Sequence, residues 1–473
     1  MKTYTTMLFL IAISLNLHTQ NLWTLEKCIS HAIENNIQVK NQELSLKVNE
    51  NQLLQSRLGL LPSISAGASE SLTFGRSVDP FTNDFEPNNY NYANFQVSSS
   101  VILFNGLSQY HAIKKAGIEK KSGFLILDKL KNDITLNVTS AYLNVLLATD
   151  LISTANHQKA ITEEQLERTI KLVEAGSISA KDMYELEAQL ANEELNIVDY
   201  ENQLNVSLLS LAQLLEIEDW ESLVIASPVL DGIITESAVL PVAEIYKEAL
   251  SMMPQIENSE LGYQSALKDL QISRSSLIPT LSLSASYGTG YSSNRTMIDQ
   301  TMPSQSILGF VTDNNGNVLD VYQNTHNYTY KKQPFSNQLK ENASAYVTFN
   351  LSIPIFNGWQ AKTQINNSKI YLEQSKYEIE QARKDLLKEI QQVHSDAVSV
   401  LKKYYATGKA LSAIQVNFNY SQKSYDEGVL NITDYNIAKN NLTKAEIEQV
   451  WAKYELVFKQ KILDFYRGKE IKL

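Results

Sequence analysis

The most constraining feature of this 473-residue chain is an internal repeat at a fixed offset. The phrase Leu103-Phe104-Asn105-Gly106 recurs as Ile355-Phe356-Asn357-Gly358, displaced by 252 positions (356 − 104 = 252). The same offset relates a second pair of phrases, Glu174-Ala175-Gly176 with Asp182 and Asp426-Glu427-Gly428 with Asp434. An unchanged offset means that neither copy carries a net insertion here, as expected of two rods of matched length. The sequence therefore predicts an internally duplicated fold.

Prolines divide each copy into segments in the same order. Residues 60–65, around Pro62, match residues 277–282, around Pro279, at an offset of 217 (279 − 62 = 217), so the extra residues of the second copy lie between Pro279 and Phe356. Residues 88–227 and 355–473 contain no proline. Each copy therefore reads as a helix, a proline, two alternating segments split by a polar loop, a Phe-Asn-Gly turn, and two long helices joined at a glycine.

Apolar residues in the proline-free tracts recur every three or four positions, which predicts long amphipathic helices. About seventy helical residues would span on the order of 100 Å. Such a rod must pack sideways against neighbours, although the stripe alone also fits an ordinary coiled coil or helical bundle. The stripes are Leu127, Leu130, Ile134, Val138, Ala141 and Val145 in the first copy, and Leu386, Ile390, Val393, Ala397, Leu401 and Tyr404 in the second.

Four segments instead alternate between apolar and polar residues, which predicts β-strands with one apolar and one hydroxyl-rich face. Open strand edges are excluded from lipid, so four such strands could span a membrane only with strands from other copies. Asn- and Ser-rich loops at 75–92 and 292–342 favour this over a soluble two-hairpin sheet. The apolar positions are Ile64, Ala66, Ala68, Leu72 and Phe74; Phe95, Val97, Val101 and Leu103; Leu281, Leu283, Ala285, Tyr287 and Tyr291; and Val347, Phe349, Leu351 and Ile353.

The N-terminus predicts secretion. A lysine at position 2 and an apolar run from Met7 to Leu17 have the form of a signal peptide, which we place at residues 1–20. No apolar run approaches the roughly 20 residues of a membrane-spanning helix. The net charge of −11 lacks the basic footprint of a nucleic-acid binder, so nucleic acid is not an expected partner.

The residues that usually carry catalysis or bind metals are scattered. His31, His111, His157, His326 and His394 have no metal-ligand spacing, and the single cysteine, Cys28, reads as a small core residue on a helix. No phosphate-binding loop or nucleophile elbow is present in the sequence, and paired carboxylates such as Glu163-Glu164 read as solvated helix faces. We therefore expect no enzyme, metal or cofactor.

Together these segments resemble the TolC-like outer-membrane factor family over nearly the whole mature chain. The phrases that carry the resemblance are Trp23 to Ile29 with Ala32 to Asn36, Leu61-Pro62, Ile278-Pro279, Leu103 to Gly106 and Pro354 to Gly358. The chain departs from the family in its short tail after Phe465-Tyr466 and at Ile437, where an acidic residue is common.

This resemblance implies a mixed fold of α-helices and transmembrane β-strands. Four strands per protomer would contribute to a trimeric, 12-stranded outer-membrane barrel, which a long α-helical coiled-coil barrel continues into the periplasm. The homotrimer would contact outer-membrane lipid and work with a periplasmic adaptor (membrane fusion protein) and an inner-membrane pump. It would bind no cofactor.

The repeat and the resemblance together predict the domain boundaries. The first structural repeat, 21–215, would hold a helix, a β-hairpin at 62–104 and a long helical hairpin at 106–215. The second, 242–466, would hold a helix, a β-hairpin at 279–356 and a helical hairpin at 358–466. Residues 216–241 would form an equatorial segment between the repeats, and residues 467–473 a short C-terminal tail.

The family's gate residues map onto the helical hairpins. The resemblance implies that Asp182 and Asp434 constrict the channel at its periplasmic gate and that Tyr425 helps to hold the mouth closed. Both carboxylates would also complement the dipole of a helix N-terminus, which is their simpler interpretation. The hairpin tips, which an adaptor would contact, are Gly176, Ser177, Ile178, Gly428, Val429 and Leu430, although these also read as plain turn residues.

Two functions thus follow from the sequence. The first is a channel of a tripartite efflux or type I secretion system, and the alternative is a secreted coiled-coil adhesin or fibre without transport activity. Matched strand pairs between the helices favour the channel. Drugs, metals and proteins all stay open as cargo, because specificity in such systems lies chiefly in the pump and adaptor.

Overall fold

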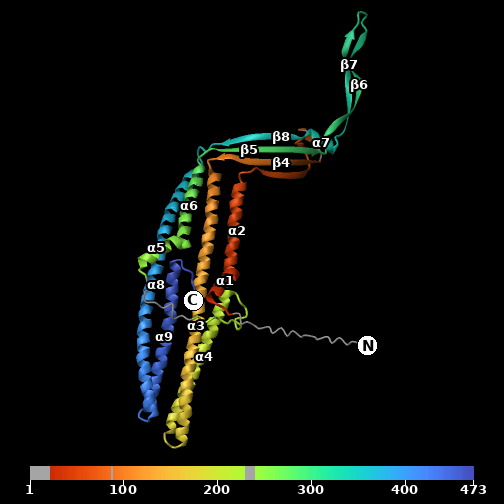
Figure 1. Ribbon diagram of the computed structural model, residues 1–473. Helices are drawn as coiled ribbons and strands as arrows, with labels where there is room; N and C mark the ends of the chain where they lie inside the picture. Colours follow the sequence, from red (N-terminus) through yellow and green to blue (C-terminus); the bar gives the residue numbers. More distant parts are fainter. Residues whose placement is uncertain (1–21, 82, 87–88, 229–239) are drawn as a thin grey trace, which may run out of the picture. The chain divides into compact units, whose positions relative to one another are not determined.

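The computed structural model describes residues 22–81, 83–86, 89–228 and 240–473, and Figure 1 traces their helices and strands. The predicted signal peptide, residues 1–20, lies outside the described residues, as do residues 229–239 of the predicted equatorial segment. The chain forms two compact units, and each takes segments from both repeats. The helical unit contains residues 22–51, 117–266 and 372–473, and the sheet unit contains residues 52–116 and 267–371.

The two long helical hairpins are confirmed, with matching lengths. Helices α3 (Ser108–Glu174) and α8 (Gln360–Asp426) have 67 residues each, and their bounds differ by the 252 positions of the repeat. The returning helices α4 (Ala180–Leu215) and α9 (Ile432–Tyr466) begin at the same offset. At ~1.5 Å per residue each long helix extends for about 100 Å. Within the described part of the chain, no helix combines the length and apolarity needed to cross a membrane.

The prediction of a single helix at the start of each repeat is wrong. Each of these segments forms two helices instead. Helices α1 (Leu25–Asn35) and α2 (Ile37–Leu58) meet at Asn36, whose Oδ1 accepts the backbone N–H of Gln38 at 2.8 Å. Helices α5 (Val242–Met252) and α6 (Pro254–Ser275) meet at Met253, where the following proline cannot continue a helix. The breaks fall at equivalent positions, displaced by 217 residues, but an asparagine cap makes one and a proline the other.

Apolar side chains of the helical unit gather where the short helices meet the long ones. Tyr142 of α3 is buried and donates its hydroxyl to the carbonyl oxygens of Trp23 at 3.1 Å and Ala226 at 2.6 Å. Trp23 forms an isolated parallel bridge with Ile225, so the start of the described chain is paired with the segment that follows the first repeat. One buried tyrosine thus secures two connecting segments against α3.

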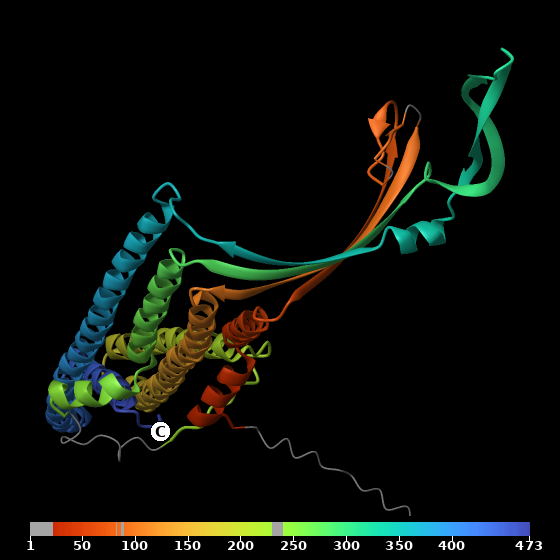
Figure 2. The same cartoon turned by 90° about the horizontal axis from the view of Figure 1, so that it is seen from above.

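The four predicted strands form one antiparallel sheet in the sheet unit, in the order β1-β4-β5-β8. Strands β1 (Ser63–Thr73) and β4 (Tyr90–Asn105) come from the first repeat, and β5 (Thr280–Ser292) and β8 (Ser344–Ser352) from the second. Figure 2 shows the twist of this sheet. Strands β1 and β8 each have one neighbour in it, so both edges of the sheet are open in the single chain.

The register separates the two faces of the sheet as predicted. Ala66 lies opposite Val97, which lies opposite Tyr287 on β5, and this face is apolar across the sheet. On the other face Ser63 bonds Ser100 at 3.0 Å and Ser65 bonds Ser98 at 2.9 Å, through their hydroxyls. Apolar side chains are more than half exposed in the single chain, which suits a surface covered by lipid. Examples are Ile64, Val347, Phe349 and Leu351.

The polar loops predicted at 75–92 and 292–342 contain regular structure, so that prediction is wrong. The first includes a short pairing of β2 (Ser77–Val78) with β3 (Phe85–Glu86). The second contains a long two-stranded ribbon of β6 (Thr296–Thr312) and β7 (Val318–Lys332), followed by helix α7 (Phe335–Glu341). The Asn, Ser and Thr content predicted loops, whereas in residues 292–342 many of these residues pair across the two strands of a ribbon.

The turn from strand to helix generates a prediction about two equivalent glycines. Gly106 and Gly358 both have left-handed backbone, with φ +64° and +62°. A Cβ at residue 106 would lie 2.8 Å from Cβ of Ile278, whereas one at residue 358 would meet nothing within 4 Å. Gly106→Ala and Gly358→Ala should each cost about 1–2 kcal/mol for the left-handed conformation, and Gly106→Ala about 1–3 kcal/mol more for the overlap.

The measurement is the urea midpoint for loss of the compact, heat-modifiable band of the detergent-solubilised protein. Gly106→Ala should lower this midpoint more than Gly358→Ala does. Equal losses for the two variants would contradict the packing of Gly106 against Ile278.

Candidate functional site

The two hairpin tips share one turn geometry. Gly176 and Gly428 have φ of +70° and +75°, so each occupies the left-handed position that ends a helix. In the first tip the N–H of Gly176 donates to the Val173 carbonyl and the N–H of Ser177 to the Leu172 carbonyl, both at 2.9 Å. The second tip repeats this pattern. The glycines therefore end α3 and α8 through matching Schellman motifs.

The two predicted gate acids lie in the first turn of the returning helices, in different surroundings. The side chain of Asn431 caps α9 by accepting the N–H of Asp434 at 2.8 Å, and its Nδ2 donates to Oδ2 of Asp434, also at 2.8 Å. Ser179 caps α4 through the N–H of Lys181 at 3.2 Å. Asp434 is exposed and Asp182 is half-buried. Both carboxylates thus complement a helix N-terminus, and Asp434 also bonds its cap.

A cavity of about 360 Å³ lies between the two tips, and it brings together predicted residues from both hairpins. The tips themselves lie at the lower ends of the hairpins in Figure 1. Of the predicted residues, Asp434, Gly176, Ser177 and Val429 do not line it. The lining residues are Gln165, Arg168, Leu172, Ile178, Asp182, Tyr425, Asp426, Glu427, Gly428, Leu430, Asn431 and Ile432.

Tyr425 belongs to an aromatic stack that joins α8 to α9. Its ring stacks on that of Tyr435 with centroids 4.9 Å apart, and the centroid of the Phe418 ring lies 5.8 Å from that of Tyr435. Tyr435 is fully buried, and burial raises the pKa of its hydroxyl well above the usual range. Tyr425 is therefore a packed residue of the tip, whereas Ile437, at the position where the family often has an acid, is more than half exposed.

One ion pair between the hairpins was not predicted. Arg168 of α3 donates from a guanidinium nitrogen to Oδ1 of Asp426 of α8 at 2.6 Å, and its other terminal nitrogen lies 3.4 Å from the Asp426 carbonyl oxygen. Asp426 belongs to the repeated phrase Asp426-Glu427-Gly428. The residue of the second repeat that is equivalent to Arg168, however, is Tyr420. The pair breaks the repeat symmetry and joins residues 258 positions apart, so the motif comparison could not find it.

Farther from the turns, a buried polar cluster lies between α3, α4 and α9. Nζ of Lys439 is 2.9 Å from Oε1 of Glu193 and donates to the Gln158 carbonyl oxygen at 2.7 Å, and it also contacts the Thr162 hydroxyl. The side chains of Lys439 and Glu193 are 1% and 5% exposed, so the pair is shielded from water. Burial lowers the pKa of Lys439, and Glu193 opposes this change. The apolar stripe did not indicate this buried pair, because a lysine on a helix usually lies on the surface.

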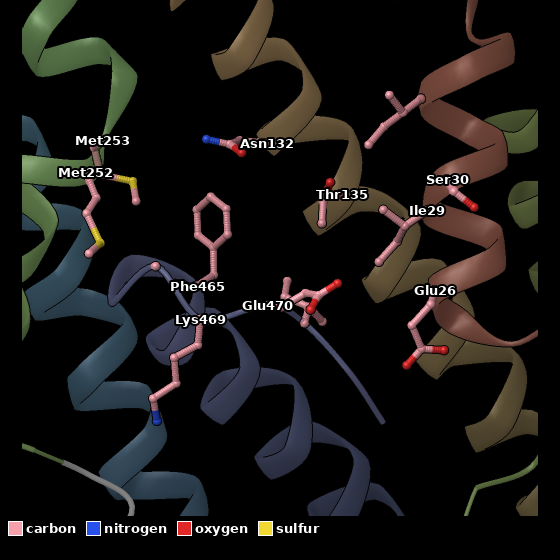
Figure 3. Close-up of a pocket in the computed structure, with 13 residues that line it drawn as sticks. Glu26, Ile29, Ser30, Asn132, Thr135, Met252, Met253, Phe465, Lys469 and Glu470 are labelled. Atoms are coloured by element: carbon pink, nitrogen blue, oxygen red, sulfur yellow. The ribbon is translucent and has the colours of Figure 1, made fainter.

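A second cavity of the helical unit, of about 510 Å³, contains none of the predicted gate or tip residues. Figure 3 shows the Phe465 ring in this cavity, between Met252 and Met253 on one side and Thr135 on the other. The cavity is also lined by Ile29 and Glu26 of α1 and by Glu470 of the C-terminal tail. The cavity is largely apolar and belongs to the packing of the tail against α1 and α3.

No sequence pattern indicates catalytic or metal chemistry, and the structure supplies two observations on that point. Among the described residues, no group of three or more His, Cys, Asp or Glu side chains is placed to hold a metal ion. Cys28 is fully buried, and burial raises the pKa of its thiol to about 12. Such a thiol has almost no thiolate at neutral pH and is a poor nucleophile.

A duplicated protomer with two long helical hairpins and a four-stranded sheet is the architecture of an outer-membrane channel subunit. The chain matches the family described as "Outer membrane efflux protein" over residues 28–216 and 245–468. It is 22% identical over 421 residues to the outer membrane protein TolC of Escherichia coli K12, covering 88% of this chain and 75% of TolC. The match with the crystal structure of CusC has a TM-score of 0.75 at 15% identity and covers 94% of this chain and 92% of CusC. The outer membrane channel CmeC of Campylobacter jejuni gives 0.73 at 15%, with 94% and 86% covered.

The chain therefore belongs to the outer membrane efflux protein family. It is a TolC-like efflux channel protein of the outer membrane, with helices that extend into the periplasm. This is a family of channels rather than of enzymes. The comparisons do not support the alternative of an adhesin or structural fibre.

The buried cluster generates a prediction about the stability of the tip. Lys439→Met should destabilise the four-helix region by about 3–5 kcal/mol, because it leaves the Glu193 carboxylate buried without its partner. The double variant Lys439→Met/Glu193→Leu should recover most of that loss, since it removes both charges. Limited chymotrypsin digestion measures the effect, because cleavage near the tips should be fast only in the single variant. Equal resistance of the parent and the single variant would contradict a paired, buried Lys439.

Proposed function

We propose that three copies of this chain close a single twelve-stranded barrel in the outer membrane. The observation that supports this most strongly is the sheet of four strands with two open edges, β1 and β8. Each backbone group in lipid needs a hydrogen-bonding partner, and membrane barrels have at least eight strands. Three copies that pair β8 of one with β1 of the next supply twelve strands and leave no edge.

Exposed apolar side chains on the long helices support lateral packing between copies. They lie on α4 and α8, the hairpin helices that would stand side by side in a twelve-helix periplasmic tunnel. Apolar surface of this extent on a secreted protein usually marks an interface. These side chains are more than half exposed in the single chain: Tyr184, Leu195, Val198, Val206, Ile370, Tyr377, Val416 and Tyr420.

The assembled duct would export substrates together with a periplasmic adaptor (membrane fusion protein) and an inner-membrane pump. Family membership supports these partners, and the exposed hairpin tips give the adaptor a defined surface. Val429 is 78% exposed, and a Cβ added at either tip glycine would meet nothing within 4 Å. Residues 1–20 would direct the chain out of the cytoplasm.

The predicted repeat boundaries also define a belt at the middle of the tunnel, formed by residues 216–241 and 467–473. Of its described residues, those at 216–228 are held through Ile225 and Ala226, as shown above. The tail is held by Arg467, whose Nε lies 3.0 Å from Oε2 of Glu248, and by the buried side chain of Ile471. These contacts support a belt that braces the long helices.

The tips would form the periplasmic gate. The Arg168–Asp426 pair ties one hairpin to the other inside a protomer, and Tyr425 packs beside it against Tyr435. Asp182 lines the cavity that these residues surround, and Asp434 lies exposed on the next helix start. In the trimer the carboxylates would recur three times and form an acidic constriction, which the ion pair keeps narrow.

The gate proposal predicts that breaking the ion pair opens the channel. Arg168→Ala and Asp426→Asn should each raise the mean single-channel conductance of the purified protein in a planar bilayer several-fold, because the two hairpins lose their link at the tip. The control is Lys171→Ala, on the same helix turn. Lys171 pairs with Glu167 of its own helix at 2.7 Å, so its loss leaves the hairpins joined. A conductance unchanged in Arg168→Ala, or equally raised in Lys171→Ala, would contradict the gate.

The adaptor contact predicts a separate effect at the tip glycines. Gly176→Leu with Gly428→Leu forces a bulky side chain into left-handed backbone, at about 1–2 kcal/mol per site, and reshapes both tips. Export by the complete tripartite system should be lost, while the amount of folded channel in the outer membrane is unchanged because the strands lie in the other unit. Normal tolerance of exported toxic compounds in a strain carrying this variant would refute the contact.

A further inference from the structure

The β6–β7 ribbon is an exposed element that channel formation does not require. It lies within the extra residues that distinguish the second repeat from the first, between β5 and β8. Within the sheets described, β6 and β7 pair only with each other. A two-stranded ribbon is at best marginally stable in water by itself, so one of this length is expected to be covered on a face.

The register gathers the aromatic side chains of the ribbon on one face, which also carries polar pairs such as Asn324 opposite Gln305. Strand β7 runs without a bulge, so its even-numbered residues share a face, and their partners on β6 join them. On this face Ile307 lies opposite Tyr322, and Phe310 lies opposite Asp320. We call it the aromatic face. Its apolar residues, each about half exposed or more in the single chain, are Ile298, Ile307, Phe310, Val318, Tyr322, Tyr328 and Tyr330.

The opposite face is polar along most of the ribbon. Ser304 lies opposite Thr325, and Ser306 lies opposite Gln323. This face also carries Met297 and Met302, and near the turn it becomes apolar at Val321, Leu319 and Val311. A face of amides and hydroxyls suits water, so the two faces of the ribbon are built for different surroundings.

The base of the ribbon is fixed to the sheet. Gln338 of α7 is buried, accepts the N–H of Ser292 at 2.9 Å and donates to its carbonyl oxygen at 3.0 Å. Asn342 donates to the Gly290 carbonyl oxygen at 2.7 Å, and Gln333 donates its N–H to the Arg295 carbonyl oxygen at 2.9 Å. Buried polar networks with paired members rigidify what they join. The ribbon is therefore presented by the end of β5 rather than tethered as a loose loop.

We propose that the aromatic face packs against the same ribbon of the neighbouring copies, so that three ribbons form a collar at the outer mouth of the channel. This inference rests on the proposed trimer, in which closure of the barrel brings three identical ribbons to the same end. The ribbon leaves the chain between β5 and β8, and β8 is the edge that would meet the next copy. Tethering the ribbons to one barrel gives them a high effective concentration, so even a weak face-to-face contact would form.

The charges of the ribbon favour a second copy over lipid. The two strands and their turn contain the acids Asp299, Asp313 and Asp320 and the lysines Lys331 and Lys332, and Lys331 is paired with Asp299 at 2.8 Å. Surfaces that bind anionic lipid carry lysine and arginine around their apolar residues, whereas the lysines of this ribbon lie only at its base, and residues 300–330 carry acids alone. Asp320 is the only acid on the aromatic face of β7, so three copies would meet with little like-charge repulsion.

Adjacent residues on opposite faces give a matched test. Tyr322→Cys places a thiol on the aromatic face and Gln323→Cys places one on the polar face, one residue away, and both positions are exposed. The full-length protein in detergent is treated with a short bismaleimide cross-linker, and dimers are counted after denaturation. The native Cys28 is buried and common to both variants. Cross-linked dimer should form on the order of tenfold faster for Tyr322→Cys than for Gln323→Cys.

A second pair, Tyr328→Cys and Thr329→Cys, repeats the comparison nearer the base. Equal rates on the two faces, in preparations that contain three copies per particle and conduct ions, would overturn the collar and leave the channel intact. A sample without trimers would overturn the channel as well, which distinguishes the two failures. A lipid contact would show as quenching of Tyr322→Trp fluorescence by brominated lipid in proteoliposomes, and that result also overturns the collar.

Discussion

Strands β1 and β8 each have a hydrogen-bonded neighbour on one side only, and most of the architecture depends on how the other sides are paired. In water an open edge can be tolerated, because solvent supplies partners. In the hydrocarbon of a membrane each unpaired backbone group costs several kcal/mol, so a sheet with an apolar face and two free edges is incomplete. The sheet therefore needs identical copies to pair its two edges. The proposed helical tunnel, the tip constriction and the collar of ribbons all follow from the threefold assembly.

Duplication explains how one chain builds two matching halves, although the chemistry at equivalent positions differs. The first helix break is made by an asparagine cap and the second by a proline. Ser179 caps one returning helix and Asn431 the other. What the halves share is backbone geometry, because the helices must keep one length and one register to pack as rods. The contacts that join the halves, such as Arg168 with Asp426, are instead asymmetric and occur once.

The sequence predicted the elements that depend on local periodicity. The hairpin helices, the four strands with their polar and apolar faces and the tip glycines were all found from spacing and repeat offset. Three features could not be predicted from the sequence. The breaks at Asn36 and Met253 each consist of a single residue between two helices, which is too short to separate them in a pattern of residue types. The β6–β7 ribbon was predicted as a loop because its composition is polar, and composition does not show which residues pair across two strands. The buried Lys439–Glu193 pair depends on helices far apart in the chain, and no local pattern marks it.

Hydrogen–deuterium exchange of the edge strands in the assembled, detergent-extracted channel tests the central claim most directly. If neighbouring copies complete the barrel, peptides covering β1 (Ser63–Thr73) and β8 (Ser344–Ser352) should be as protected as those covering β4 and β5. Fast exchange of about half of the amides in β1 and β8, beside slow exchange in β4 and β5, would show that the edges stay unpaired and would contradict the account.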